Sequence, residues 1–224
     1  MIVTMIATTS SEALEGRSGV GRIEAFSDGV VAIIVTIMVL ELHPPVSEGM
    51  DKLWTLWPTF LAYVLSYAYV AIYWVNHHRL FGHATRVSNG LIWANILLLF
   101  ALSLVPFSTS YLGEHNFSRD ATILYLVSLI APAAAYFWLQ WTIRCTGQQG
   151  EAARRYHRRM MRKGAFGLFL YLFGIPLSFL SPWLGIACAA TGALLWVLPQ
   201  GPIDRLFDDR GTGQNRDTRG NAGE

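Results

Sequence analysis

Long apolar blocks separated by short polar segments dominate the pattern of the chain. Four blocks are each at least 20 residues long: residues 23–42, 53–75, 91–112 and 121–143. About 20 apolar residues in a helix cross the hydrocarbon core of a bilayer. Residues 165–198 can hold two short spans, because Ser181-Pro182 provides a turn in the middle; one span with a re-entrant piece is the alternative. The pattern predicts an all-α, polytopic membrane protein with six transmembrane helices per subunit.

Composition agrees with this class. Of the 224 residues, 53% are hydrophobic and only 14% are charged, whereas soluble domains have about 25% charged residues. We expect residues 21–200 to form the transmembrane domain, with a disordered leader at 1–20 and a disordered tail at 201–224.

The basic residues predict the orientation. The segments after the second and fourth blocks contain Arg79, Arg86 and the arginine-rich run 154–163, whereas those after the first and third contain only Lys52 and Arg119. Lys and Arg collect on the cytoplasmic side, so both termini are predicted to be cytoplasmic. The run 154–163 is interpreted as a topology determinant in a loop, with anionic lipid headgroups as the alternative ligand. Nucleic acid is not needed to explain it.

The first block contains acidic residues that a lipid-exposed helix would not tolerate. Only residues 29–40 are uncharged between Asp28 and Glu41, which is about 18 Å of helix against a hydrocarbon core of about 30 Å. Ionisable groups inside a membrane face protein or water and indicate function. We therefore expect the first helix to be central.

Helical periodicity places three aliphatic residues of this block on one stripe: Ile33, Ile37 and Leu40. The small residues Gly29, Ala32 and Thr36 flank it. A stripe of this kind either forms an apolar constriction that gates by dewetting or fills a helix–helix contact. The pattern alone favours packing.

Glu24 and Asp28 share a helix face and repel each other at a spacing of four residues. Either a cation from another helix lies near them or one of the two is protonated, and the candidates for the cation are His77, His78 and Arg79. The resulting network would either shape a pore mouth or be an ordinary interhelical ion pair.

The same polar residues offer little support for other classes of function. Adjacent histidines point about 100° apart on a helix, and no Cys or carboxylate follows at ligand spacing, so no metal or other cofactor is expected. A proton-coupled small carrier that uses Asp28 and His77 is the main rival, although no internal repeat supports it. No nucleophile–base pair indicates an enzyme. Asn76, Asn95 and Gln140 are interpreted as interhelical hydrogen-bonding residues, and Pro106 with Thr109 predicts a kink.

The motif Arg22-xxx-Phe26-Ser27-Asp28-Gly29, followed by Ala32-Ile33, Thr36 and Leu40-Glu41, resembles the signature of the transmembrane protein 175 family. This family contains potassium-permeable channels of endosomes and lysosomes and their prokaryotic relatives. The segments Trp74-Val-Asn-His77-His78-Arg-Leu-Phe81 and Asn95–Thr109 also resemble the family. The resemblance covers residues 20–112 well and the remainder mainly by span count.

The resemblance implies a homotetramer in the cell membrane, surrounded by lipid. Its pore is lined by helix one and conducts K⁺ passively with weak selectivity over Na⁺. It places the pore constriction at Ile33, with further apolar rings at Ile37 and Leu40, and associates Thr36 with selectivity. It also implies a structural motif that holds helix one against its neighbours: Arg22, Phe26, Ser27, Asp28, His77 and His78.

Overall fold

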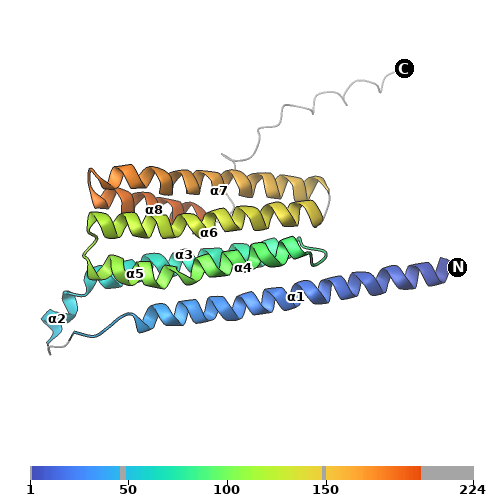
Figure 1. The fold of residues 1–224 in the computed structure, drawn as a ribbon, viewed down its shortest axis with the longest axis horizontal. Helices are drawn as coiled ribbons and strands as arrows, with labels where there is room; N and C mark the ends of the chain where they lie inside the picture. The colour runs from blue at the N-terminus through green and yellow to red at the C-terminus, as the bar shows by residue number, and fades with distance from the viewer. Residues whose placement is uncertain (1, 46–48, 148–149, 198–224) are drawn as a thin grey trace, which may run out of the picture.

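The computed structural model describes residues 2–45, 49–147 and 150–197 and is helical throughout, without strands in these ranges. The helices are α1 (Ile2–Leu40), α2 (Met50–Trp54), α3 (Trp57–Phe81), α4 (Asn89–Ser103), α5 (Val105–Glu114), α6 (Arg119–Thr146), α7 (Glu151–Ser178) and α8 (Pro182–Val197). The long helices lie side by side, with α1 and α7 on opposite sides and α4, α5 and α6 between them (Figure 1).

Four helical segments are long and apolar enough to cross a membrane: Ser18–Leu40, Trp57–Phe81, Asn89–Glu114 and Arg119–Thr146. They coincide with the first four predicted blocks. The chain is therefore a multi-pass membrane protein. The helix α8 is apolar but shorter, and the first half of α7 is strongly basic.

The third of these segments is broken between α4 and α5. Pro106 lacks a backbone N–H and its ring clashes with a carbonyl of the preceding turn, which explains the break at Leu104. The hydroxyl of Thr109 donates to the Val105 carbonyl at 2.7 Å, and its oxygen lies 2.7 Å from the Ser66 hydroxyl of α3, from which it can accept. The predicted kink is confirmed, and a polar side chain next to it links α5 to α3.

Two segments differ from the expectations. The run 154–163, predicted to be a loop, is helical inside α7, because it contains good helix formers and buries His157, Met160 and Lys163 on one side. The helix α1 begins at Ile2, within the expected disordered leader. The leader has no proline, and α1 approaches the α3–α4 connection so closely that a methyl group at Gly19 would lie 2.9 Å from Val87. The expected tail 201–224 lies outside the described residues.

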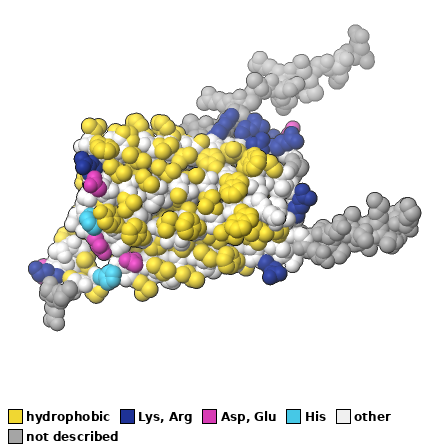
Figure 2. All heavy atoms as spheres, viewed as in Figure 1, with side chains coloured by type: hydrophobic (Ala, Val, Ile, Leu, Met, Phe, Trp, Pro, Cys, Tyr) yellow, Lys and Arg dark blue, Asp and Glu magenta, His cyan; other side chains and the backbone are white. Residues whose placement is uncertain are grey.

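Tryptophans and charges mark the two ends of the bundle. Exposed tryptophans occur near one end at Trp54, Trp57 and Trp183, and on the other half at Trp93, Trp138 and Trp141, as in the aromatic belts of membrane proteins. Figure 2 shows Lys and Arg gathered at the end where α6 leads into α7, whereas the visible Asp, Glu and His lie mainly toward the other end. The concentration of Lys and Arg at one end of the bundle matches their unequal distribution among the polar segments of the sequence.

One buried histidine at the basic end makes stability depend on pH. Neither ring nitrogen of His157 has a hydrogen-bond partner among the described residues. Burial, followed by the charges of His83 and Arg144, lowers the pKa of His157 to about 4. The unfolded chain takes up this proton near pH 6.5, so the free energy of unfolding falls as pH decreases from 6.5 to 4.

We expect His157 to contribute up to about 1.4 kcal/mol of destabilisation per pH unit in this window. Unfolding in detergent at pH 7 and pH 5 measures it. His157→Leu should lose less stability than the wild type on acidification, whereas His43→Leu, at an exposed histidine, should behave like the wild type. Equal losses in all three proteins would contradict the prediction.

Candidate pore-lining face and its supporting network

Among the described residues, the helix α1 packs against α3, α4 and α5. The buried side chains on the contacting face are Ser27, Val31, Ile34 and Met38, at spacings of four, three and four residues. This is the periodicity of one helical face. The rotation of α1 about its axis is therefore set by its neighbours within the subunit.

The opposite face of α1 forms an exposed ridge. Ile33 is 59% exposed, Ile37 40% and Leu40 73%. Gly29 and Thr36 are exposed on the same side, and a methyl group at Gly29 would meet nothing within 4 Å. The Thr36 hydroxyl donates to the Ile33 carbonyl at 2.8 Å. The structure brings the predicted stripe together on a face that has no partner among the described residues.

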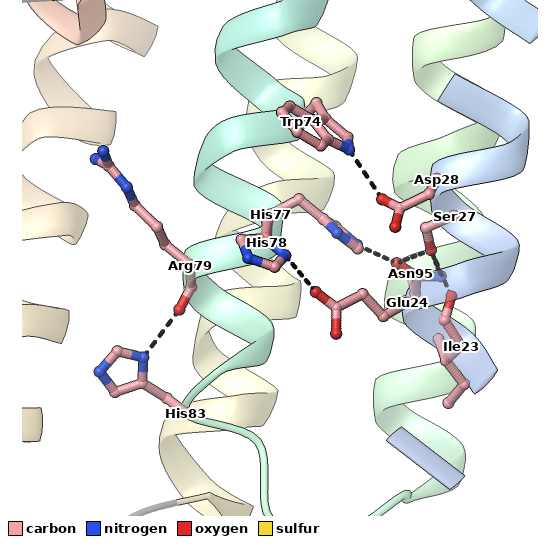
Figure 3. A network of polar contacts seen from close by, with 10 residues as sticks. All are labelled: Ile23, Glu24, Ser27, Asp28, Trp74, His77, His78, Arg79, His83 and Asn95. Atoms are coloured by element: carbon pink, nitrogen blue, oxygen red, sulfur yellow. Dashed lines mark hydrogen bonds and ion pairs between the residues drawn. The ribbon is translucent and has the colours of Figure 1, made fainter. Parts of the chain in front are cut away.

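A buried hydrogen-bond network fixes the other side of α1. The Ser27 hydroxyl donates to the Ile23 carbonyl at 2.8 Å, and the Asn95 amide of α4 donates to Ser27 at 2.9 Å. His77 of α3 then bonds through Nε2 to the Asn95 carbonyl oxygen at 2.8 Å (Figure 3). Because that oxygen can only accept, Nε2 carries the proton. His77 also stacks on Phe81, with ring centroids 4.3 Å apart. Asn95 thus joins three helices.

Glu24 and Asp28 of α1 have separate partners on α3. Glu24 pairs with Nδ1 of His78 at 2.6 Å, and Asp28 accepts the indole N–H of Trp74 at 2.9 Å. Arg79 points away from both carboxylates, and its carbonyl accepts a hydrogen bond from His83 at 3.0 Å (Figure 3). Of the three predicted candidates, only His78 contacts this carboxylate pair.

Sequence reasoning missed Trp74 as a partner of Asp28. A signal was present, because Glu24 and Asp28 are four residues apart, as are Trp74 and His78 on a helix that runs in the opposite direction. Two pairs with this spacing on antiparallel helices can face each other in register.

The remaining motif residues, Arg22 and Phe26, lie outside this network. They line a groove of about 480 Å³ between α1 and α4, together with Ile23, Val87 and Ile96. Both side chains are exposed. They adjoin the ridge at its basic end and are placed to contact whatever the ridge contacts.

The described ranges contain no group of three or more His, Cys, Asp or Glu side chains with the geometry to hold a metal ion. The site therefore consists of an aliphatic ridge, a threonine hydroxyl and a hydrogen-bonded support. Such a surface can form an apolar constriction for ions or a helix–helix contact.

Comparisons with known proteins identify the family. The family described as endosomal/lysosomal potassium channel TMEM175 matches residues 22–106. A potassium channel of Chryseobacterium sp. (strain P1-3) is 41% identical over 190 residues, which cover 84% of this chain and 98% of that protein. The endosomal/lysosomal proton channel TMEM175 of Bos taurus is 30% identical over 182 residues, covering 75% of this chain and 37% of its own length.

A solved structure gives the same result for the fold. The crystal structure of a lysosomal potassium-selective channel TMEM175 homolog from Chamaesiphon minutus superposes with a TM-score of 0.70. The two chains are 34% identical, and the match covers 80% of this chain and 96% of the other. The chain with the exposed α1 ridge and the Ser27–Asn95–His77 network therefore belongs to the TMEM175 family.

Proposed function

We propose that this chain is the subunit of a potassium-permeable cation channel that conducts passively through a pore lined by α1. The observation that carries the proposal is the exposed ridge of Ile33, Ile37 and Leu40 on a helix whose opposite face is fixed by α3, α4 and α5. The names of the relatives support K⁺ as the permeant ion.

The subunit has six transmembrane helices in this proposal. The four long spans are joined by the apolar second half of α7 and by α8, which pack against each other. Ser181 alone separates the turn after α7 from the first residue of α8. An even number of spans puts both termini on one side. The basic end of the bundle is then cytoplasmic in the cell membrane.

Four copies are proposed to surround a common axis. A single ridge cannot enclose a pore, so copies of α1 must face one another. The buried face leaves only the ridge side of α1 for the axis.

Conduction would depend on hydration of the narrow region. Rings of Ile33, Ile37 and Leu40 exclude water when they close, and ions pass with much of their hydration shell when the rings widen. Aliphatic side chains cannot replace that shell as carbonyl oxygens do, so selectivity over sodium is weak. Thr36, the hydroxyl-bearing residue between these rings, is proposed to contribute to the selectivity that exists.

The motif residues have a structural role in this proposal. Ser27, Asp28, His77 and His78 hold α1 against α3 and α4, while Arg22 and Phe26 shape the adjoining groove. A proton-coupled carrier through Asp28 and His77 is less well supported, because Asp28 accepts from Trp74 and His77 bonds to Asn95. Neither group directs its hydrogen bond at the other.

Planar bilayer recording of the purified protein tests the proposal. We expect unitary current steps that persist without a pH gradient and a reversal potential shifted toward that of K⁺ in asymmetric K⁺/Na⁺ solutions. Cation flux that requires coupled proton movement and shows no unitary steps would favour the carrier instead. A pH gradient alone, applied in a separate recording, measures proton permeation, the activity named for the Bos taurus relative.

A further inference from the structure

The helix α7 carries a stripe that is basic at one end and aromatic along the rest. The stripe consists of exposed side chains three or four residues apart: Arg155, Arg158, Arg162, Phe166, Phe169 and Phe173. The phenylalanine rings follow one another, with centroid distances of 6.4 Å from Phe166 to Phe169 and 5.6 Å from Phe169 to Phe173. One face of a single helix therefore offers cations and then a row of rings.

Packing on the other side of α7 keeps this stripe facing outward. His157, Met160, Gly167 and Tyr171 are buried against the bundle. The Lys163 ammonium is also buried and lies 5.1 Å from the centroid of the Trp196 ring. The helix cannot rotate without losing these contacts, so the direction of the stripe is a fixed property of the subunit.

Neighbouring residues of α6 indicate how deep the stripe lies in the membrane. A methyl group at Gly164 would come within 3.2 Å of Phe137, so these positions are level in the two antiparallel helices. Trp138 and Trp141 follow on α6 with exposed rings, and exposed tryptophans occupy the headgroup level of a bilayer. Arg162 and Arg158 therefore lie at the headgroups, and the three phenylalanines lie in the hydrocarbon.

We propose that this stripe binds an anionic phospholipid of the leaflet at the basic end of the bundle. Guanidinium groups of Arg158 and Arg162 contact the phosphate, because they are one helical turn apart on the same face and suit the geometry of phosphate oxygens. An acyl chain lies along Phe166, Phe169 and Phe173. Arg155 lies one helical turn further from the phenylalanines than Arg158.

Charge and position argue for lipid as the occupant. A topology determinant needs basic residues near the membrane but does not require them in line with an aromatic row. The helix α7 lies on the side of the bundle opposite α1 (Figure 1), and Figure 2 shows basic side chains at the α7 end adjoining a hydrophobic surface. A soluble phosphate has no acyl chain that could contact the phenylalanines.

Lipid retention by the full-length protein tests the proposal. The protein is placed in nanodiscs of equal phosphatidylglycerol and phosphatidylcholine, and bound lipids are counted by native mass spectrometry after release. We expect preferential retention of phosphatidylglycerol. At about 1 kcal/mol per surface arginine, R158Q/R162Q should weaken its binding roughly 30-fold. The control R86Q/R154Q removes the same charge at the same end, from exposed positions outside the stripe, and should change it less than threefold.

Three outcomes would overturn the proposal. The first is an equal loss in both double variants, which would reduce the effect to net charge. The second is an absence of phosphatidylglycerol preference in the wild type. The third is full displacement of the lipid by soluble glycerol phosphate, which would remove any role for the phenylalanines. Circular dichroism and gel filtration of each variant show whether the fold is retained. If R158Q/R162Q does not fold, Phe169→Ala provides the test instead: it keeps every charge and should weaken the retention of phosphatidylglycerol.

Discussion

Replacing Ile33 with asparagine is expected to raise the potassium conductance of the channel about tenfold. Ile33 is exposed on the ridge of α1, and a ring of its copies would exclude water from the narrow part of the pore. Asparagine would keep that region hydrated and so lower the free-energy barrier to ion passage. Lowering that barrier by about 1.4 kcal/mol corresponds to a tenfold change in rate. Single-channel recording in planar bilayers with symmetric KCl measures the change.

A matched substitution on α7 provides the control. Leu172 is also aliphatic and 51% exposed, but it lies on the opposite side of the bundle from α1. Leu172→Asn should leave the unitary conductance unchanged. Ile33→Ala should act in the same direction as asparagine but less strongly, because it widens the ring without adding polar groups. Unchanged currents from both Ile33 variants would reject this residue as the constriction.

Replacing Asn95 with leucine should give the largest loss of stability among single changes in the α1 support. Asn95 donates to Ser27 and accepts from His77, and all three side chains are buried. Leucine would leave both partners without this bond, at a cost of about 1–3 kcal/mol for each buried group. The free energy of unfolding in detergent should therefore fall by roughly 2–6 kcal/mol.

Two further variants calibrate this loss. Ser103→Ala removes an exposed hydroxyl of α4 that donates only to the Phe100 carbonyl, and surface changes of this kind stay within about 0.5 kcal/mol. His78→Ala removes the exposed pair with Glu24 and should cost no more than about 1 kcal/mol. If Asn95→Leu unfolds with the same free energy as Ser103→Ala, the network does not hold α1 in place.

Hydropathy was sufficient for the first four spans and failed at α7. The four blocks are apolar over a full membrane crossing, so their existence follows from length and composition. The basic run before Ala165 has no such signal, because its helical state depends on burying His157 and Met160 against the bundle. Hydropathy does not detect that packing, and the helix-forming residues of the run were outweighed by its polarity.

The candidate site could be predicted in part. Periodicity placed Ile33, Ile37 and Leu40 together, and the structure confirms that they share an exposed face. Asn95 was correctly expected to bond between helices. The pairing of Asp28 with Trp74 was missed, because only charged partners were considered for a carboxylate inside the membrane. The role of the ridge stays a prediction, since it depends on contacts between subunits.

The hydrogen bonds that hold α1 are concentrated near one end of its transmembrane part. Glu24, Ser27 and Asp28 attach that end to α3 and α4, whereas Ile34 and Met38 hold the other end by apolar packing alone. Taking Ser27 as a pivot, Ile33 lies about 9 Å along the axis and Leu40 about 20 Å. A small tilt of α1 about Ser27 therefore displaces Leu40 about twice as far as Ile33, so in the proposed pore the ring at Leu40 would change width more than the ring at Ile33.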